Sequence, residues 1–184
     1  MEHKGTLMLE TERLVLRRFA IEDAVMVFDN WAGDDEVTRY MTWPTRRNIE
    51  ETEKSVCSWA ERYVSDSFYH WAITLKEDGN LIGFVSVISC DEIVQKVEMG
   101  YCIGKRWWNK GYMTEALAKV VYFLFKEVGV QRIQACHDTN NPNSGRVMSK
   151  CGMKYEGTMR KAEKTNNGIC DIAYYAILSE DYIK

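Results

Sequence analysis

Residues 105–118 read KRWWNKGYMTEALA and join a predicted strand to the longest helical pattern in the sequence. The start of a helix leaves several backbone N–H groups without partners and carries a partial positive charge, so it favours a bound anion. Gly111 has no Cβ and lets the backbone approach a bound group closely. With Lys105, Arg106 and Lys110 nearby, the stretch predicts a pyrophosphate-binding loop. An ordinary loop that begins a core helix is the alternative.

The segments on both sides of this loop have regular hydrophobic patterns. Before it, apolar residues alternate and predict a strand over 94–103. After it, a broad apolar stripe predicts a helix that ends at Gly129 and packs on a sheet. The stripe consists of Ala116, Leu117, Val120, Val121, Leu124, Phe125 and Val128.

The rest of the chain continues this alternation of strand and helix patterns. Asn141 and Pro142 resemble an N-cap and first position of a short helix that ends before Gly152. The element order β-α-α-β-β-β-α-β-α-β-β, without repeats or linkers, predicts one α/β domain over 1–184 around a mixed sheet. The other predicted strands are 14–18, 69–75, 81–88, 132–136, 153–160 and 170–178, and the other helices are 21–31 and 48–65, with a break at 33–35 between them.

Composition narrows the classes of function. The 184 residues are 46% hydrophobic and 28% charged, which is typical of a globular chain. A net charge of −3 argues against nucleic acid as a main partner. No segment approaches the roughly 18 apolar residues of a membrane span, and none resembles a signal peptide. We therefore expect a cytoplasmic protein that binds no membrane.

Cysteines and histidines give no metal-binding pattern. The six cysteines are widely spaced without a C-x-x-C pair, and His3, His70 and His137 do not complete a zinc motif. We expect reduced cysteines and no metal.

Five phrases of the sequence resemble one family in order and span nearly the whole chain. The chain resembles the GNAT acetyl-CoA-dependent N-acetyltransferases, and within them the RimJ/RimL-like ribosomal-protein N-terminal acetyltransferases. The resemblance implies a mixed, mostly antiparallel central sheet flanked by helices, acetyl-CoA as cosubstrate, and a homodimer. The phrases are LETERLVLRRF (9–19), LIG (81–83), GYCIG (100–104), WNKGYMTEAL (108–117) and NPNSGRVMSKCGMKYEG (141–157).

The resemblance also implies a set of cofactor-binding residues. The family's loop pattern [QR]-x-x-G-x-[GA] corresponds to 108–113, where only the central glycine is kept. Asn141 matches the asparagine that contacts the pantetheine arm, although its side chain has helix capping as an alternative role. Arg146 and Lys150 could reach phosphates or form a solvated helix face. The implied cofactor contacts are Tyr101, Cys102, Ile103, Trp108, Asn109, Lys110, Gly111, Tyr112, Met113, Thr114, Asn141 and Arg146.

Acetyl transfer to an amine needs a base, because an α-amine has a pKa near 8 and must lose a proton. Glu98 lies on the strand before the loop, and Glu163 matches a glutamate proposed as base in the RimL-like branch. A solvated strand residue and a loop charge are their respective alternatives. The departing thiolate benefits from an acid. Many GNAT enzymes use a tyrosine where this chain has Met148, so the resemblance moves this role to Ser144, whose alternative is a helix-start hydroxyl.

These residues predict an acetyl-CoA-dependent N-acetyltransferase that works by direct attack in a ternary complex, with a protein N-terminal α-amine as acceptor. A small amine, such as an antibiotic or a polyamine, is an alternative acceptor, and a non-catalytic acyl-CoA-binding module is the alternative class. Aromatic residues in the region of the acceptor side either shape a substrate slot or belong to the core. They are Tyr40, Trp43, Trp59, Tyr69 and Trp71.

Overall fold

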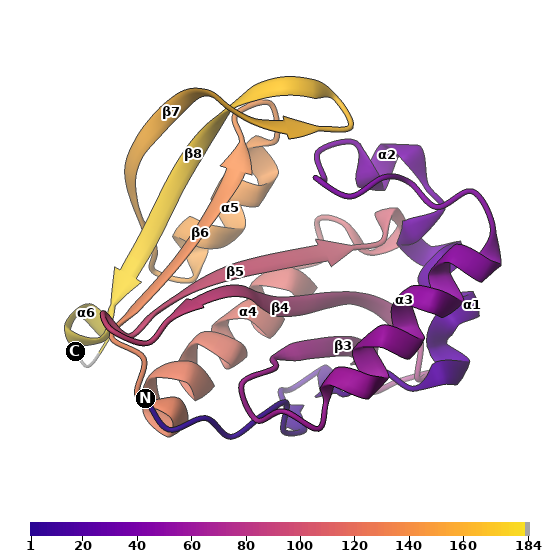
Figure 1. The fold of residues 1–184 in the computed structure, drawn as a ribbon, viewed down its shortest axis with the longest axis horizontal. Coiled ribbons are helices and arrows are strands. Elements are labelled where there is room, and N and C mark those ends of the chain that lie inside the picture. The colour runs from indigo at the N-terminus through magenta and orange to yellow at the C-terminus, as the bar shows by residue number, and fades with distance from the viewer. Residues whose placement is uncertain (183–184) are drawn as a thin grey trace.

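The computed structural model describes residues 1–182, and one eight-stranded sheet runs through them (Figure 1). The strands are β1 (Leu9–Glu10), β2 (Leu14–Arg17), β3 (His70–Leu75), β4 (Leu81–Asp91), β5 (Lys96–Ile103), β6 (Arg132–Asp138), β7 (Lys154–Thr165) and β8 (Gly168–Leu178). Their order is β1-β2-β3-β4-β5-β6-β8-β7, and every pair is antiparallel except β5 with β6. The predicted mixed, mostly antiparallel sheet is confirmed.

Helices cover both faces of this sheet. They are α1 (Ala24–Val27), α2 (Asp35–Thr38), α3 (Ile49–Arg62), α4 (Tyr112–Phe123), α5 (Pro142–Lys150) and α6 (Ser179–Tyr182), with 3₁₀ or π turns at Ile21–Asp23, Phe28–Ala32, Lys105–Trp107 and Leu124–Val128. Alternate strand residues enter two cores. Trp71 and Ile73 pack with the apolar stripe of α4, whereas Ala72 packs with residues of α1 and α3. The predicted stripe of α4 therefore lies against the sheet.

The N-terminal third differs in detail from the sequence prediction. The helix predicted over 21–31 is one helical run of 3₁₀, α and π turns. The predicted break is present at Gly33 and Asp34, but it is followed by a short helix, α2, that was not predicted. This helix begins there because the side chain of Asp34 accepts hydrogen bonds from the backbone N–H groups of Glu36 and Val37. The elements β1 and α6 were missed, since two and four residues are too short for a periodic pattern.

The feature that positions the site is the separation of β5 from β6. The two strands pair only between Lys96–Met99 and Arg132–Ala135. Beyond this, β5 stays paired with β4 up to Ile103, and β6 stays paired with β8 up to Asp138. The sheet therefore opens into a V, which Figure 1 shows between the diverging ends of β5 and β6. The facing edges of the two arms keep backbone groups that need another partner.

No helix in the described part of the chain, residues 1–182, has both the length and the apolar character needed to cross a membrane.

A substitution tests the close approach of β4 to the end of β5. A Cβ at Gly83 would lie 2.2 Å from the carbonyl oxygen of Cys102 and 2.9 Å from Cα of Ile103, both backbone atoms. We expect Gly83→Ala to lower the free energy of unfolding by about 2–3 kcal/mol, the usual cost of overpacking. Urea denaturation followed by circular dichroism measures it.

Gly100→Ala is the matched control, because its Cβ would meet no backbone atom, and its closest contact would be the side chain of Ile88, which is 61% exposed and can move. Equal stability of the two variants would contradict the close approach.

Candidate functional site

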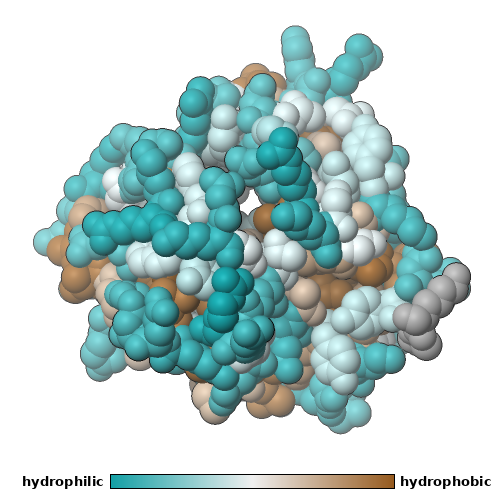
Figure 2. Space-filling view, turned by 180° about the vertical axis from the view of Figure 1, so that it is seen from behind, coloured by the Kyte–Doolittle hydropathy of each residue, from teal (hydrophilic) through white to brown (hydrophobic). Residues whose placement is uncertain are grey.

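A pocket of about 380 Å³ opens where β5 and β6 separate. The end of β5, the 105–111 loop and the first turns of α4 and α5 form its walls, together with residues of α2 and the segment after it. The face of the molecule turned away from the viewer in Figure 1 is mostly hydrophilic and is hollowed near its centre (Figure 2). Every predicted cofactor residue except Lys110 lines the pocket, as does Ser144. The structure therefore gathers residues from three separate sequence phrases.

The loop before α4 has the backbone conformation that the sequence predicts for a close approach. Gly111 occupies the N-cap of α4 with φ 81° and ψ −4°, a left-handed conformation that favours glycine. Asn109 also has a positive φ, 60°. An added Cβ at Gly111 would have only Arg13 Nη2 within 4 Å, at 3.5 Å, so the space beside it is open. The free N–H groups of the first turn of α4 are available to an anion.

Arg13 braces this loop from the N-terminal segment. Its Nη1 donates to the carbonyl oxygen of Lys110 at 3.1 Å, and its guanidinium lies 4.4 Å from the ring centroid of Tyr112. Its Nε donates to Glu115 at 2.7 Å. Partial burial alone would raise the pKa of Glu115, but hydrogen bonds from Thr11 and Arg13 hold it below the usual value. Glu115 therefore stays ionised and fixes Arg13 against the loop.

Ser144 forms a hydrogen-bonded pair with Tyr101. The Tyr101 Oη lies 2.9 Å from both the Oγ and the carbonyl oxygen of Ser144. Burial raises the pKa of Tyr101, so the phenol keeps its single proton at neutral pH. When Tyr101 donates to the carbonyl oxygen, it accepts from the Ser144 hydroxyl; when it donates to Oγ, the Ser144 proton is free for another acceptor. The alternative role of Ser144, a bond to the helix backbone, is not what the structure shows.

Asn141, at the start of helix α5, and Met148, within it, differ in whether they line the pocket. Asn141 occupies the N-cap position of α5 and Pro142 begins the helix, as predicted, but the Asn141 side chain makes no capping hydrogen bond. Asn141 is one of the residues that line the pocket. Met148 is only 1% exposed and belongs to the core, so this position offers no polar group to the pocket.

The two base candidates do not line this pocket. Glu98 follows Val97 and precedes Met99, which are both in the core beneath α4, so its side chain points to the opposite face of the sheet. It accepts hydrogen bonds from Gln134 Nε2 at 2.9 Å and from Cys136 Sγ at 3.6 Å. Burial chiefly, then the charges of Glu98 and Glu163, raises the pKa of Cys136 to about 12. Glu98 therefore lies beside Cys136, whereas Glu163 is an exposed residue of β7 that pairs with Cys170 of β8.

Several pocket residues were missed. Glu36, Val37 and Met41 come from α2 and its C-terminal side, and an ion pair between Glu36 and Lys105 links this region to the loop. Because α2 was not predicted, no sequence pattern indicated that its residues would line the pocket. Trp107, Asn143 and Val147 also line the pocket, and Lys150, which was named as a phosphate contact, lines it too.

Most of the five aromatic residues expected near the acceptor side belong to the core, which was the alternative to a substrate slot. Tyr69 and Trp71 are no more than 1% exposed, and Trp43 and Trp59 pack against the core beneath α1 and α3. Of the five, Tyr40 lines the pocket.

Known proteins with similar sequences cover most of the chain. The family model for the acetyltransferase (GNAT) domain matches residues 13–154. An uncharacterized N-acetyltransferase of Bacillus subtilis, YoaA, is 31% identical over 170 residues, which are 92% of this chain and 96% of that protein. The [ribosomal protein uS5]-alanine N-acetyltransferase of Escherichia coli is 25% identical over 160 residues, 81% of this chain and 79% of that protein.

Solved structures give the same fold. A GNAT-family acetyltransferase from Bacillus anthracis superposes with a TM-score of 0.83 and 28% identity, over 95% of this chain and 99% of that one. RimL, titled a ribosomal L7/L12 alpha-N-protein acetyltransferase in complex with coenzyme A, superposes with a TM-score of 0.83 and 18% identity, over 94% and 98%. Together with the match to the family over residues 13–154, these comparisons establish that the chain belongs to the GNAT acetyltransferase family, as its sequence predicts.

Proposed function

We propose that this N-acetyltransferase takes acetyl-CoA into the pocket at the V and transfers the acetyl group to a protein N-terminal α-amine on the opposite face of the sheet. The observation that carries the proposal is the V itself. The strands separate directly after Met99, one residue beyond Glu98, and a pocket lined by Gly111, Asn141 and Ser144 lies at this separation. A donor and an acceptor can therefore approach the same opening from two sides.

The residues of the pocket fit acetyl-CoA. The N-terminus of α4 and the open space beside Gly111 suit a pyrophosphate, and Arg146 and Lys150 on the exposed side of α5 suit further phosphate groups. The edge of 100–103 that faces away from β4 has no strand partner in the described part of the chain, and the carbonyl oxygen of Ile103 on this edge accepts from Trp108 Nε1. The remaining groups of this edge and the Asn141 side chain, which makes no capping hydrogen bond, suit the amide groups of a pantetheine arm. When bound, acetyl-CoA supplies an acetyl group activated as a thioester.

The protonation state of the thiols near the opening supports direct transfer to the amine. Burial raises the pKa of Cys102 and of Cys136 to about 12, so both thiols stay protonated at neutral pH and are poor nucleophiles. Glu98 or Glu163 removes the proton of the amine, and Ser144, oriented by Tyr101, offers a proton to the leaving sulfur. We infer from this arrangement a ternary complex without an acyl-enzyme.

The acceptor is inferred from the relatives. The Escherichia coli relative is named for the alanine of a ribosomal protein, and RimL for the α-N position of another. Both names describe a protein N-terminus as acceptor. A small amine would need the same base and acid, so a panel of N-terminal peptides and small amines, followed by thiol release, separates the two acceptors. Turnover on small amines alone would replace the peptide proposal, and binding of acetyl-CoA without turnover would favour a non-catalytic module.

The first prediction concerns the loop. Gly111→Asp places a carboxylate beside the pyrophosphate position and strains a left-handed residue, so we expect the Kd for acetyl-CoA to rise by more than about 30-fold. Isothermal titration calorimetry measures it. Gly79→Asp is the matched control, because Gly79 has a similar φ of 72° and nothing within 4 Å of an added Cβ. Unchanged affinity in Gly111→Asp would rule out the loop as the phosphate site.

The second prediction concerns the acid. We expect Ser144→Ala to lower kcat about 100-fold with little change in the Kd for acetyl-CoA, because a positioned proton donor is lost. Tyr101→Phe leaves the serine in place but removes its hydrogen-bond partner, and should cost about tenfold. Ser149→Ala is the control, since its hydroxyl bonds the carbonyl oxygen of Gly145 in the same helix and does not line the pocket. Full activity in Ser144→Ala would remove the serine from the mechanism.

The third prediction separates the two glutamates. The variant that removes the base, either Glu98→Gln or Glu163→Gln, should lower kcat at pH 7 by about 100-fold. The deficit should shrink above about pH 9, where an α-amine with a pKa near 8 is already neutral. Glu61→Gln, an exposed residue of α3, is the control. If both variants keep wild-type rates at pH 7, neither glutamate is the base.

A further inference from the structure

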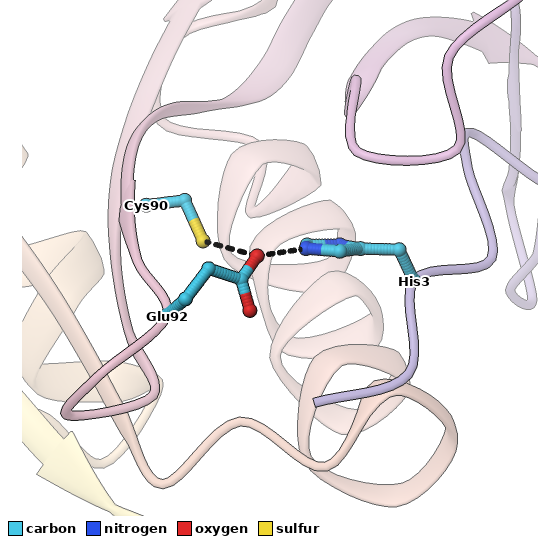
Figure 3. A group of neighbouring side chains, drawn as sticks. All are labelled: His3, Cys90 and Glu92. Atoms are coloured by element: carbon cyan, nitrogen blue, oxygen red, sulfur yellow. Dashed lines mark hydrogen bonds and ion pairs between the residues drawn. The ribbon is translucent and has the colours of Figure 1, made fainter.

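Three side chains with metal-binding atoms meet at the end of the molecule where the chain begins. They are His3 of the N-terminal segment, Cys90 near the end of β4, and Glu92 of the β4–β5 turn (Figure 3). One ligand atom from each lies within 4.8 Å of the others. His3 Nε2 is 2.5 Å and Cys90 Sγ is 3.9 Å from the same Glu92 oxygen, Oε1. None of the three lines the pocket at the V.

The imidazole of His3 is held in place through Nδ1, the ring nitrogen that does not contact Glu92. Its Nδ1 lies 3.0 Å from the hydroxyl of Tyr69, a core residue that is 1% exposed. The same hydroxyl accepts a hydrogen bond from the backbone N–H of Lys4. A histidine that binds a metal through Nε2 usually donates its other ring N–H to such a partner, which fixes the ring and the tautomer. Tyr69 is therefore in the position of an outer-shell partner.

The neighbouring backbone fixes the rest of the cluster. Glu2 N donates to the carbonyl oxygen of Val128 at 2.8 Å, and Gly5 N donates to that of Asp66 at 2.8 Å, so His3 lies between two anchored residues. In the turn, the carboxylate of Asp91 accepts from the N–H groups of Ile93 and Val94. This leaves the Glu92 carboxylate directed at His3.

The carboxylates of Asp91 and Glu92 place negative charge beside the cluster. Within residues 1–182, the ion pair of Glu92 is with His3, and no lysine or arginine forms a salt bridge with Asp91 or Glu92.

We propose that His3, Cys90 and Glu92 bind a zinc ion that fastens the N-terminal segment to the β4–β5 turn. Imidazole nitrogen, thiolate and carboxylate are the ligands that zinc takes in proteins, and the thiolate disfavours magnesium and calcium. Tetrahedral zinc with bonds of about 2.0–2.3 Å separates its ligand atoms by about 3.3–3.8 Å. The Cys90–Glu92 separation is close to this, and Glu92, which is 61% exposed, needs to move about 1 Å from His3. The third pair, His3 and Cys90, lies within 4.8 Å and has to close by at most about 1 Å, to which the exposed Cys90 can contribute. A fourth position is left for water.

The test is titration of the untagged, chelator-treated chain with zinc chloride by calorimetry. We expect one zinc ion per chain, and at least about tenfold weaker binding in His3→Ala and in Cys90→Ser. Cys57→Ser is the matched control, because Cys57 is a half-buried cysteine outside the cluster. Thermal unfolding of the metal-free variants shows whether each is folded.

Two further readouts sharpen the test. Cobalt(II) in place of zinc should give a thiolate-to-cobalt absorption band that Cys57→Ser keeps and Cys90→Ser loses. Zinc should raise the Tm of the wild type and not that of Cys90→Ser, because it binds the folded chain. No zinc binding by the wild type, or equal binding by His3→Ala, Cys90→Ser and Cys57→Ser, would overturn the proposal.

Discussion

The site depends on a change of hydrogen-bond partners in the middle of the sheet. After Met99 and Ala135, strands β5 and β6 no longer bond each other, yet each stays bonded to its outer neighbour. Backbone N–H and C=O groups at the facing edges then lack a partner from the sheet, and buried groups of this kind are costly unless something satisfies them. A ligand with amide groups of its own supplies such partners. The opening is thus a gap in the pairing of the sheet, and β4 and β8 hold the strands on its two sides.

Two sets of contacts stabilise the segments on the two sides of the V. On the α4 side, the ionised Glu115 fixes Arg13, and Arg13 fixes the loop before Gly111 through a carbonyl oxygen and an aromatic ring. On the α5 side, the phenol of Tyr101 ties strand β5 to the first turn of the helix through Ser144. The proposed phosphate site and the proposed proton donor are therefore positioned by residues that precede the loop or lie on strand β5, and not by the loop alone.

Sequence patterns predicted the elements in which the apolar spacing repeats several times. They missed features that depend on residues far apart in the sequence or on very short segments. The stripe of α4, helix α3 and the β3–β4 hairpin were predicted because each repeats its apolar spacing several times. Helix α2 has four residues and depends on one capping side chain, so no periodicity signalled it. The residues of the pocket that share a motif with Gly111 or Asn141 were found together. Arg13 and the His3–Cys90–Glu92 cluster were not, since their partners lie 97 and 89 positions away. The extent of β5–β6 pairing is a property of register and has no local sequence signal.

Amide hydrogen exchange with and without acetyl-CoA tests the central claim most directly, because it reports on the backbone groups of the V. The account predicts that acetyl-CoA slows exchange in 100–103 and in 111–114, with little change in the β3–β4 hairpin. Protection confined to other parts of the chain, with both of these segments unchanged at saturating acetyl-CoA, would contradict binding in the V.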